Sequence, residues 1–311
     1  MRVQAVVVTF NRLPMLQRLI PRLQETAGLE RILVVDNAST DGTGEWLAGL
    51  EASSADAPVP APPVVRESLP TNTGGAGGFH HGLECAVRDG ADLVWLMDDD
   101  GLPAPDCLDL LLERVERDSL EFCGPAVLAE QDPSRLCFPI RLPGGTAVVH
   151  AMADVEAAAR DGLIEGVVIP FNGVLVTRDL VERIGLPREE FFIWGDDVEY
   201  LWRSARAGAR IATVVDAHFL HPATDDLGTP MMFGRTTYNH TASDLKHYCM
   251  ARNNTLNLRA YRGWAHVLLF WLKTTWFYTF TKPQPTRIPL SVRAAAAGLR
   301  GDFTGHRRYL R

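Results

Sequence analysis

The chain has 311 residues, of which 46% are hydrophobic and 22% are charged, so it can bury a sizeable core and most of it cannot be disordered. Residues 1–244 carry 19 Lys and Arg against 37 Asp and Glu, whereas residues 245–311 carry 12 basic residues against one acid. This division argues against a nucleic-acid-binding protein with a uniformly basic surface, and it predicts two regions with different tasks.

The first half of the chain alternates between strand and helix patterns. Residues 3–9 form a continuous apolar run, which is typical of a strand buried on both faces, and apolar residues at helical spacing follow over 16–23. A second strand over 31–35 ends at Asp36, and a third over 93–97 ends at Asp98. This order predicts an α/β fold with a mostly parallel, Rossmann-like sheet and helices on both faces. Such sheets bind ligands at the carboxyl ends of their strands.

The remaining segments have less regular patterns. Residues 53–63 are rich in Pro and Ala and predict a surface loop, while 167–177 predict a strand pair or a bent strand around Asn172. A short helix is expected over 178–184. Residues 191–208 predict a loop followed by a helix that Gly208 ends, and a strand is expected over 210–215. For that helix we expect one apolar face, formed by Val198, Leu201, Trp202 and Ala205.

Two acidic clusters carry the strongest chemical signal. Asp98, Asp99 and Asp100 follow a buried strand, and Asp196 and Asp197 precede a helix. Adjacent carboxylates repel one another, and a bound cation relieves that repulsion. In a strand-like geometry Asp98 and Asp100 point to the same side, so the two can share one ion; a solvated acidic turn is the alternative.

His221 lies in the sequence FLHP, after the last expected strand of the sheet. One imidazole added to carboxylate and diphosphate oxygens suits Mn²⁺ or Mg²⁺. A structural role is the alternative for this single histidine.

Residues 72–79, NTGGAGGF, place four glycines ahead of an expected helix. Glycines let backbone N–H groups approach an anionic ligand, and a helix N-terminus favours such a ligand. The spacing fits neither a Walker motif nor the dinucleotide-binding fingerprint, which lowers support for ATP and NAD sites. A tight turn is the alternative.

The cysteines and the N-terminus narrow the class of protein further. The five cysteines share no Cys-x-x-Cys spacing, and the first residues lack the apolar run and cleavage site of a signal peptide. We therefore do not expect a disulfide scaffold, a zinc ribbon or a secreted protein.

Five motifs in order, VVVTFNR, VVDNASTDGT, NTGGAGGF, WLMDDDG and WGDDVEYLWR, resemble those of the family 2 glycosyltransferases of GT-A fold. The glycine-rich element, WLMDDDG, the FNG at 171–173, the GDDVE helix and LHP are most similar to those of the galactofuranosyltransferases of actinobacterial cell-wall galactan synthesis. In its short chain length and in the sequence of residues 138–142, the protein resembles the initiating enzymes rather than the longer polymerases. The resemblance covers roughly residues 3–260. Taken with the charge division, it predicts a catalytic domain over 1–244 and a helical, membrane-associated region over 245–311.

The resemblance implies a donor site at the ends of the strands. The residues that would hold the uracil, ribose and diphosphate of a UDP-sugar are Thr9, Phe10, Arg12, Asp36, Asn72, Gly75, Asp98 and Asp99. Asp98, Asp100 and His221 would hold a divalent cation, Mn²⁺ or Mg²⁺, which stabilises the UDP leaving group.

For the acceptor, the resemblance implies that Asp197 is the general base that removes the proton of the attacking hydroxyl. Spacing alone does not show whether Asp196 or Asp197 is the base. The family pattern, an acidic residue followed by Asp-x-Asp/Glu, assigns the base to Asp197 and places Glu199 at its last position. A single carboxylate base on the acceptor side implies one displacement and inversion at the anomeric carbon. Trp194 is expected to stack on an acceptor sugar, with ordinary loop packing as the alternative.

Residues 247–261 place Tyr248, Arg252 and Asn253 after the sheet. Related transferases have a similar Tyr and Arg-Asn element, where the cation can meet phosphate. A solvated helix face explains the pattern equally well.

Residues 263–281 are rich in aromatic side chains but are interrupted by His266, Lys273 and four threonines. A helix in the plane of the membrane interface therefore fits better than a spanning one, and seven basic residues over 282–311 suit anionic lipid. Packing on the catalytic domain or on a partner subunit is the alternative. We expect a cytoplasmic protein, peripheral on the inner face of the cell membrane, and leave a homo-oligomer open.

The leading hypothesis is an inverting, metal-dependent transferase that moves galactofuranose from UDP-galactofuranose to a polyprenyl-diphosphate-linked GlcNAc-rhamnose acceptor. Another sugar nucleotide, such as dTDP-rhamnose, remains the alternative, because uracil and thymine differ by one methyl group. An inactive glycan-binding module is disfavoured, since Asp98, Asp100, Asp197 and His221 are all present. A nucleotidyltransferase is disfavoured because no glycine-rich loop follows the first strand directly.

Overall fold

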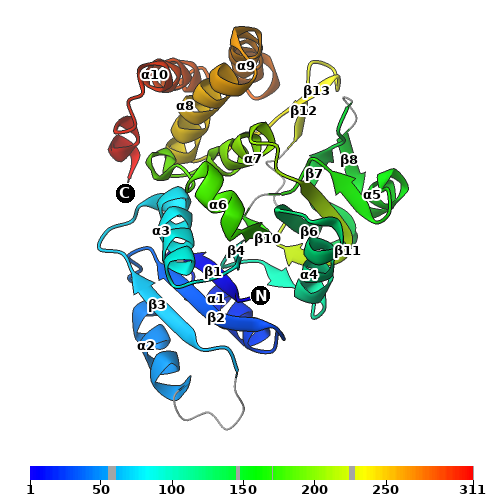
Figure 1. Ribbon diagram of the computed structural model, residues 1–311. Helices are drawn as coiled ribbons and strands as arrows, with labels where there is room; N and C mark the ends of the chain where they lie inside the picture. Colours follow the sequence, from blue (N-terminus) through cyan, green and yellow to red (C-terminus); the bar gives the residue numbers. More distant parts are fainter. Residues whose placement is uncertain (55–60, 145–147, 170, 224–227, 311) are drawn as a thin grey trace. The chain divides into compact units, whose positions relative to one another are not determined.

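Four parallel strands form one side of the central sheet (Figure 1). They are β1 (Val3–Thr9), β2 (Leu29–Asp36), β3 (Val64–Ser68) and β4 (Leu93–Asp98), in the order β3-β2-β1-β4. The register pairs Thr9 with Asp36 and Val8 with Asp98. The carboxyl ends of three strands therefore meet at one edge, which confirms the expectation of a mostly parallel sheet at this end of the chain.

The other side of the sheet is mixed. Strand β10 (Asn172–Thr177) runs antiparallel to β4 and to β6 (Phe122–Ala129), and β11 (Ile211–His221) runs parallel to β6. Further strands extend it: β5 (Leu102–Pro103), β7 (Asp132–Arg141), β8 (Val148–Ala151) and β9 (Leu163–Glu165). Strand β11 shifts register between Val214 and His218 and continues six residues beyond the predicted end at 215. His221 is consequently the last residue of a strand, rather than a loop residue after it.

Helices cover both faces of the sheet because its residues alternate between two cores. Val3, Ala5 and Val7 pack in one apolar cluster with α1 (Leu13–Gln24), α2 (Thr43–Ser54) and α4 (Cys107–Asp118). Val6 and Val8 pack in the other with α3 (Gly74–Arg88) and α6 (Arg178–Ile184). Two further helices are α5 (Met152–Ala158) and α7 (Asp196–Arg206), and a 3₁₀ turn spans Glu189–Phe191.

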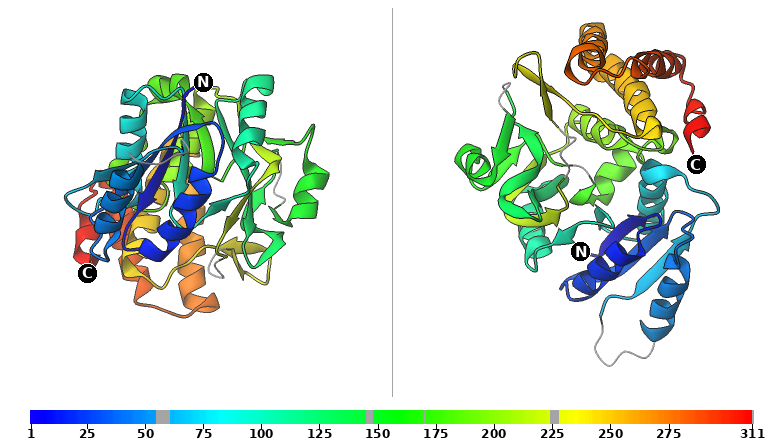
Figure 2. Two further views of the ribbon diagram at one scale, coloured as in Figure 1. Left: turned by 90° about the horizontal axis from the view of Figure 1, so that it is seen from below. Right: turned by 180° about the vertical axis from the view of Figure 1, so that it is seen from behind.

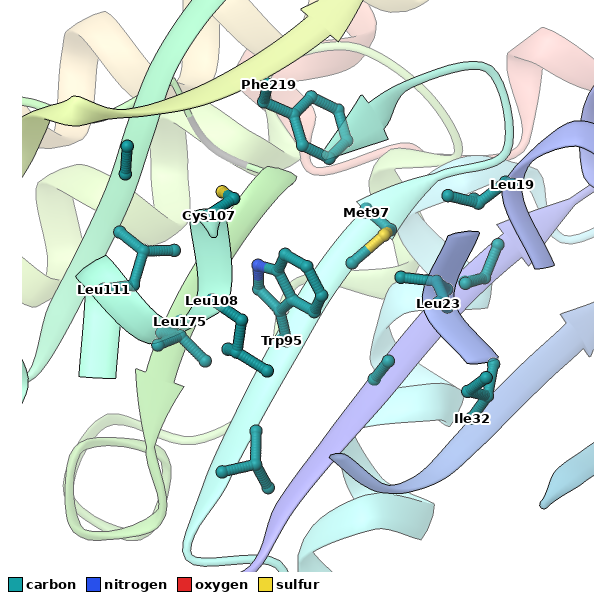
Figure 3. Packing of buried hydrophobic residues seen from close by; sticks show 14 of the residues in the cluster. Leu19, Leu23, Ile32, Trp95, Met97, Cys107, Leu108, Leu111, Leu175 and Phe219 are labelled. Atoms are coloured by element: carbon teal, nitrogen blue, oxygen red, sulfur yellow. The ribbon is translucent and has the colours of Figure 1, made fainter. Parts of the chain in front are cut away.

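Figure 3 shows how the first of these cores closes around Trp95 of β4. Leu108 and Leu111 of α4 and Met97 of β4 lie around the indole in this view. The indole is fully buried, and its Nε1–H donates to the Gly173 carbonyl oxygen at 2.8 Å, so burial leaves no unsatisfied donor there. This core fixes the strand that leads into Asp98.

The last part of the chain is helical. It contains the hairpin β12 (Thr229–Met231) and β13 (Thr236–Tyr238), then α8 (Asp244–Tyr261), α9 (Trp264–Trp276), a π-helical turn (Phe277–Thr281), α10 (Arg287–Arg300) and a 3₁₀ turn (Gly305–Tyr309). Figure 2 shows the C-terminal helices grouped together, in agreement with the packing of α8 on both α9 and α10. No helix over the described residues is long and apolar enough to cross a membrane.

The computed structural model describes residues 1–54, 61–144, 148–169, 171–223 and 228–310. Their contacts define two compact units: unit 1 is Met1–Glu189 with Tyr200–Ala223, and unit 2 is Glu190–Glu199 with Thr224–Arg311. This boundary differs from the one at residue 244, which was drawn from the distribution of charged residues. Charged residues lie mostly on the surface, whereas the units follow from packing, and the hairpin packs on α9. Tyr238 stacks on Phe277 with ring centroids 4.7 Å apart, and its hydroxyl lies 2.9 Å from Thr274 Oγ1.

Three local expectations change in detail. The predicted loop over 53–63 lies mostly outside the described residues, and α2 extends to Ser54. The segment 167–177 contains a strand only from Asn172. In α7 the buried residues are Asp196, Glu199, Tyr200 and Ser204, and the predicted apolar face is only partly covered. That helix therefore buries polar groups that the apolar pattern could not predict.

Candidate functional site

A polar network lies where β1 and β4 end in unit 1. Thr9 Oγ1 donates to Asp99 Oδ2 at 2.6 Å, and Arg12 Nη1 lies 3.3 Å from Asp99 Oδ1. Arg12 also forms an ion pair with Asp100. Because Asp99 is 3% exposed, these two donors replace the water that its carboxylate loses on burial. The FNR turn and the acidic triplet are thus joined by hydrogen bonds and ion pairs.

Asp100 and His221 approach each other across the sheet. His221 Nε2 lies 3.1 Å from Asp100 Oδ1, yet this buried oxygen accepts no hydrogen bond of acceptable geometry from the residues that the structure describes. In the charged imidazolium the Nε2 proton faces this oxygen as an ion pair, and a cation bound by both atoms would take the place of that proton. The pair therefore fits the oxygen and nitrogen donors of a Mn²⁺ or Mg²⁺ site.

The imidazole of His221 is oriented by its other nitrogen. Nδ1 lies 2.9 Å from the Pro222 carbonyl oxygen and 3.4 Å from Cys137 Sγ. A carbonyl oxygen can only accept, so the proton of the neutral ring belongs on Nδ1, and Nε2 keeps the lone pair that a metal ligand needs. Phe138 packs edge-on against the ring with centroids 5.0 Å apart. Sequence analysis missed Cys137 and Phe138 because β7 brings them in from a distant part of the chain.

Asp98 interacts electrostatically with Asp99 and Asp100, but its carboxylate lies farther from the pair formed by Asp100 and His221. Burial, and then the carboxylates of Asp100 and Asp99, raise the pKa of Asp98 to about 7. Its ligand atom does not form a group with those of Asp100 and His221 within 4.8 Å of one another. Three carboxylates repel one another when no cation is bound, and Arg12 holds Asp100. The structure brings two of the three predicted ligands together, and Asp98 stays a predicted third.

In the other titrating groups, the effect of burial on the pKa opposes the effect of the neighbouring side chains. Burial raises the pKa of Asp99 to about 6 against the opposing effects of Thr9 and Arg12. Burial also works to raise the pKa of Asp100, but His221 and Arg12 outweigh it and lower that pKa to about 2. For His221, burial works to lower the pKa, and the partners Asp100 and Cys137 raise it to about 10. A cation therefore has to displace protons from this site.

The end of β2 supports the nucleotide loops. Asp36 is buried and its Oδ1 accepts from Ser39 N at 2.9 Å, which shapes the turn after the strand. The adjacent Asn37 reaches the glycine-rich element: its Oδ1 accepts from Thr73 N and its Nδ2 donates to Gly74 O, both at 2.8 Å. Sequence analysis assigned a role to Asp36 and overlooked Asn37, although the pattern Asp-Asn-Ala-Ser after a strand could have indicated it.

The glycine-rich element forms the first turns of α3 rather than a loop ahead of it. A Cβ on Gly78 would lie 2.4 Å from Val8 Cγ1, so this glycine allows close packing of helix on strand. A Cβ on Gly75 would meet no atom within 4 Å. Asn72 Oδ1 accepts from Gly74 N at 2.8 Å. Within the element, only the start around Asn72 and Gly75 has the open backbone that a ligand needs.

Phe10 and Arg12 follow β1 with exposed side chains, Phe10 being 40% exposed. The backbone between them turns at Asn11, which has φ +52° and whose Oδ1 accepts from Thr40 N at 2.7 Å. The loops after β1 and β2 are therefore tied together, with the Phe10 ring left open to solvent. An exposed aromatic ring beside buried polar groups is suited to stack on a base.

The predicted acceptor residues lie in unit 2, at the start of α7. Asp197 is half-buried, and its Oδ1 accepts from Val198 N at 2.7 Å and from Gly195 N at 3.2 Å. Burial raises the pKa of this carboxyl against those two hydrogen bonds. Asp196 and Glu199 are 5% and 3% exposed, and Glu199 Oε1 accepts from the Tyr261 hydroxyl at 2.6 Å. Asp197 is thus the most accessible of the three, as a base that meets an acceptor must be.

The loop before α7 is held by asparagines of α8. Asn253 Nδ2 lies 2.6 Å from the Trp194 carbonyl oxygen and 3.1 Å from that of Phe191, and Asn257 Nδ2 donates to Gly195 O at 2.7 Å. Trp194 has φ +66°, a strained conformation for a large side chain, and these donors stabilise it. Trp194 contributes to the apolar cluster of unit 2, so its ring has a packing role in addition to any acceptor contact.

Arg252 and Asn253 form neither a phosphate contact nor a solvated helix face, the two roles that the sequence leaves open. Both are fully buried, and Arg252 Nη2 donates to the Phe191 carbonyl oxygen at 2.7 Å. Tyr248 is also buried. Sequence analysis missed this because side chains that bond to backbone carbonyls leave no complementary residue type in the sequence.

Comparison with known proteins places these features in a family. Residues 4–174 match the model of the family described as glycosyl transferase family 2. The galactofuranosyltransferase GlfT1 of Mycobacterium tuberculosis is 34% identical over 305 residues, covering 96% of each chain.

Solved structures share the fold. Residues 1–349 of TarS from S. aureus have a TM-score of 0.61 at 16% identity, covering 98% of this chain and 81% of theirs. A structure of GalNAc-T7 with UDP, GalNAc and Mn²⁺ also has a TM-score of 0.61, at 12% identity, covering 94% of this chain and 55% of that one. The ordered motifs, the GT-A arrangement of the sheet and the match over more than half of the chain agree: this protein is a glycosyltransferase and belongs to glycosyl transferase family 2.

Proposed function

We propose that the protein transfers galactofuranose from UDP-galactofuranose to a polyprenyl-diphosphate-linked GlcNAc-rhamnose acceptor, with inversion at the anomeric carbon, as the first transfer of a cell-wall galactan. The observation that carries the proposal is the 34% identity to a galactofuranosyltransferase over 96% of both chains. The named site residues are all present, and the pairing of Asp100 with His221 supports metal-dependent departure of UDP.

In this proposal unit 1 binds the donor. Asp100 and His221, with Asp98, would hold a divalent cation, which neutralises charge on the departing diphosphate. Arg12 lies beside the carboxylates and adds a fixed positive charge. Asp36 accepts from uracil N3–H or a ribose hydroxyl, Phe10 stacks on the base, and the start of α3 at Gly75 faces the phosphates.

Asp197 would remove the proton of the attacking acceptor hydroxyl. Its raised pKa favours proton acceptance, since a stronger base is a better acceptor near neutral pH. Val198 N and Gly195 N bind one of its oxygens, and the carboxylate is thereby oriented before substrate arrives. One base and one displacement give inversion.

We further propose that unit 2 binds the inner face of the membrane. One face of α9 packs inward through Val267 and Thr274, whereas Leu268 and Leu272 are each 58% exposed. This corrects the sequence-based picture in part: Phe277 and Tyr278 are buried in the core of unit 2, whereas Trp264, Phe280 and the leucines of α9 are exposed.

The charge of unit 2 supports the same partner. A hollow of about 340 Å³ between α10 and the C-terminal 3₁₀ turn is lined by Arg293, Arg300 and Arg308, with one acid, Asp302. Guanidinium groups suit anionic lipid headgroups, and exposed apolar side chains suit the boundary between headgroups and acyl chains. A lipid-linked acceptor would be reached at that surface.

Transfer assays with a panel of sugar nucleotides and a synthetic polyprenyl-diphosphate GlcNAc-rhamnose acceptor test the donor and the acceptor together. We expect mass spectrometry to detect added hexose with UDP-galactofuranose and Mn²⁺, and none with UDP-glucose. Transfer from dTDP-rhamnose but not from UDP-galactofuranose would replace the proposed donor with the alternative one. Stereochemistry follows from NMR of the product.

A further inference from the structure

A second group of metal-binding side chains lies on unit 1, away from the acidic triplet in the sequence. Glu67 is on β3, and His81 and Cys85 are on α3, four residues apart and therefore on one face of the helix. Among the residues that the structure describes, this is the one group of three His, Cys, Asp or Glu whose ligand atoms all lie within 4.8 Å of one another.

The two distances from His81 Nε2 match edges of a tetrahedral zinc site, and the third pair of ligand atoms lies within 4.8 Å. His81 Nε2 lies 3.3 Å from Glu67 Oε2 and 3.5 Å from Cys85 Sγ. With Zn–N of about 2.0–2.1 Å, Zn–O of about 2.0–2.2 Å and Zn–S of about 2.3 Å, the edges of a tetrahedron are about 3.3–3.5 Å for N···O and about 3.5–3.6 Å for N···S. The contact between His81 Nε2 and Glu67 Oε2 is longer than the usual N–H···O hydrogen bond of about 2.9–3.0 Å.

The chemistry also favours an ion over hydrogen bonds alone. Both neighbours approach the same nitrogen, and Nε2 of a neutral imidazole can donate one proton or accept one, but not both. A carboxylate, a thiolate and a neutral imidazole carry two negative charges, which Zn²⁺ balances. A thiolate with an imidazole selects zinc over Mg²⁺ or Ca²⁺, which prefer oxygen.

The surroundings suit a closed inner side and an open outer side. Cys85 is buried in the apolar cluster between α3 and the sheet, whereas the side chains of His81 and Glu67 are 31% and 35% exposed. Water can therefore occupy the fourth position. The site connects the edge strand β3 to α3, the helix whose first residue, Gly74, is held by Asn37.

We propose that Glu67, His81 and Cys85 bind one Zn²⁺ with a water as fourth ligand, a structural site that fastens β3 to α3 beneath the glycine-rich element. The inference is independent of the proposed sugar transfer, because it rests on side chains that no step of that reaction uses.

The test is metal binding to the full-length, chelator-treated protein in excess Mg²⁺, which keeps the carboxylate site occupied. We expect one Zn²⁺ per chain by competition with a chromophoric chelator, a thiolate-to-metal charge-transfer band with Co²⁺, and a rise of several degrees in unfolding temperature with Zn²⁺. All three should be lost in Cys85→Ser and in His81→Gln. The second variant changes a partly exposed residue and keeps the test valid if the buried cysteine variant does not fold.

Two matched controls locate the ion. Cys137→Ser changes the cysteine beside His221, and His80→Gln changes the histidine adjacent to His81, whose Nδ1 lies 2.7 Å from the Pro187 carbonyl oxygen. Both should keep the zinc and the cobalt band. Failure of the parent protein to bind Zn²⁺ at micromolar concentration would overturn the proposal, and so would a cobalt band that disappears in Cys137→Ser but survives in Cys85→Ser.

Discussion

At the scale of single residues, the site of unit 1 contains more carboxylates than cationic side chains, and a bound cation would offset the remaining negative charge. Asp100 Oδ1 is buried beside His221 Nε2 without a proper hydrogen bond, and Arg12 offsets only part of the acidic charge. Burial and the neighbouring carboxylates raise the pKa values of Asp98 and Asp99. Protons and a cation therefore compete for the same groups.

This competition predicts how cation affinity depends on pH. The pKa of Asp98 is raised to about 7, so below that pH a cation must displace its proton, and His221, with a pKa of about 10, holds a proton throughout the neutral range. We expect the affinity for Mn²⁺ to rise by at least about tenfold per pH unit from pH 6 to pH 7 and to keep rising to pH 8. Titration calorimetry at the three pH values measures it, and a constant affinity would contradict the proposed ligands.

The same pKa values fix the stability of the cation-free protein. Asp98 has a folded pKa above its ordinary value of 3.8, so between about pH 4 and pH 7 its contribution to the free energy of unfolding falls as pH rises. His221 also has a raised pKa, and its stabilising contribution is complete below about pH 6.5 and is lost as pH rises through about 10. Cation binding should thus stabilise the fold more at pH 8 than at pH 6.

The choice of catalytic base is a second residue-scale prediction. Asp197→Asn keeps the shape of the side chain and removes its ability to accept a proton, so we expect transfer to fall by about 10²–10⁴-fold or more with UDP binding retained. Glu199→Gln is the comparison, because Glu199 is buried and already accepts from Tyr261. If Asp197→Asn stays active while the Asp196 or Glu199 variant does not, the base has been assigned to the wrong carboxylate.

At the scale of elements, helix α3 uses one glycine for close packing and another at the proposed phosphate contact. Gly78→Ala would place a Cβ 2.4 Å from Val8 Cγ1, and such overpacking costs about 1–3 kcal/mol of unfolding free energy. Gly75→Ala meets no atom within 4 Å and should leave the stability unchanged or slightly higher. Urea denaturation of the two variants measures the difference; equal stability would mean that α3 can move away from β1 at no cost.

Sequence patterns predicted best those elements whose burial alone determines the pattern of apolar residues. The apolar runs ending at Thr9, Asp36 and Asp98 gave the parallel strands, since a strand buried on both faces must be apolar throughout. They also placed the acidic triplet at the sheet edge.

The remaining features depend on contacts between distant segments. The extension of β11 to His221, the support of its ring by Cys137 and Phe138, and the clamp of Asn253 on Trp194 all involve residues more than 50 positions apart. Asparagine bonding to backbone carbonyls has no sequence partner, and a buried polar face on α7 is opposite to the apolar pattern that the sequence presents.

At the scale of the whole molecule, the charge asymmetry corresponds to two kinds of surface task. The acids of unit 1 include the proposed cation site, and unit 2 carries both exposed leucines on α9 and a hollow lined by arginines. The packing boundary lies near residue 223 rather than 244, so the basic region is best regarded as part of a larger unit that also contains the start of α7.

Membrane binding is the prediction that belongs to this scale. Replacing Leu268 and Leu272 with Gln removes exposed apolar area without touching the core, so we expect at least tenfold weaker binding to vesicles containing anionic lipid, with unchanged unfolding temperature. Met15→Gln, an exposed apolar residue of α1, is the matched control. Vesicle sedimentation measures the effect, and unchanged partitioning of the double variant would remove α9 from the membrane interface.

The central claim is that Asp100 and His221 form a cation site that holds the diphosphate of the donor. Titration of UDP in the presence and absence of Mn²⁺ tests it directly, in the parent protein, in Asp100→Asn and in Asp109→Asn, which changes an exposed carboxylate of α4. We predict that Mn²⁺ tightens UDP binding by about 10–100-fold in the parent and in Asp109→Asn, and not in Asp100→Asn. An equal gain from Mn²⁺ in Asp100→Asn would contradict the site.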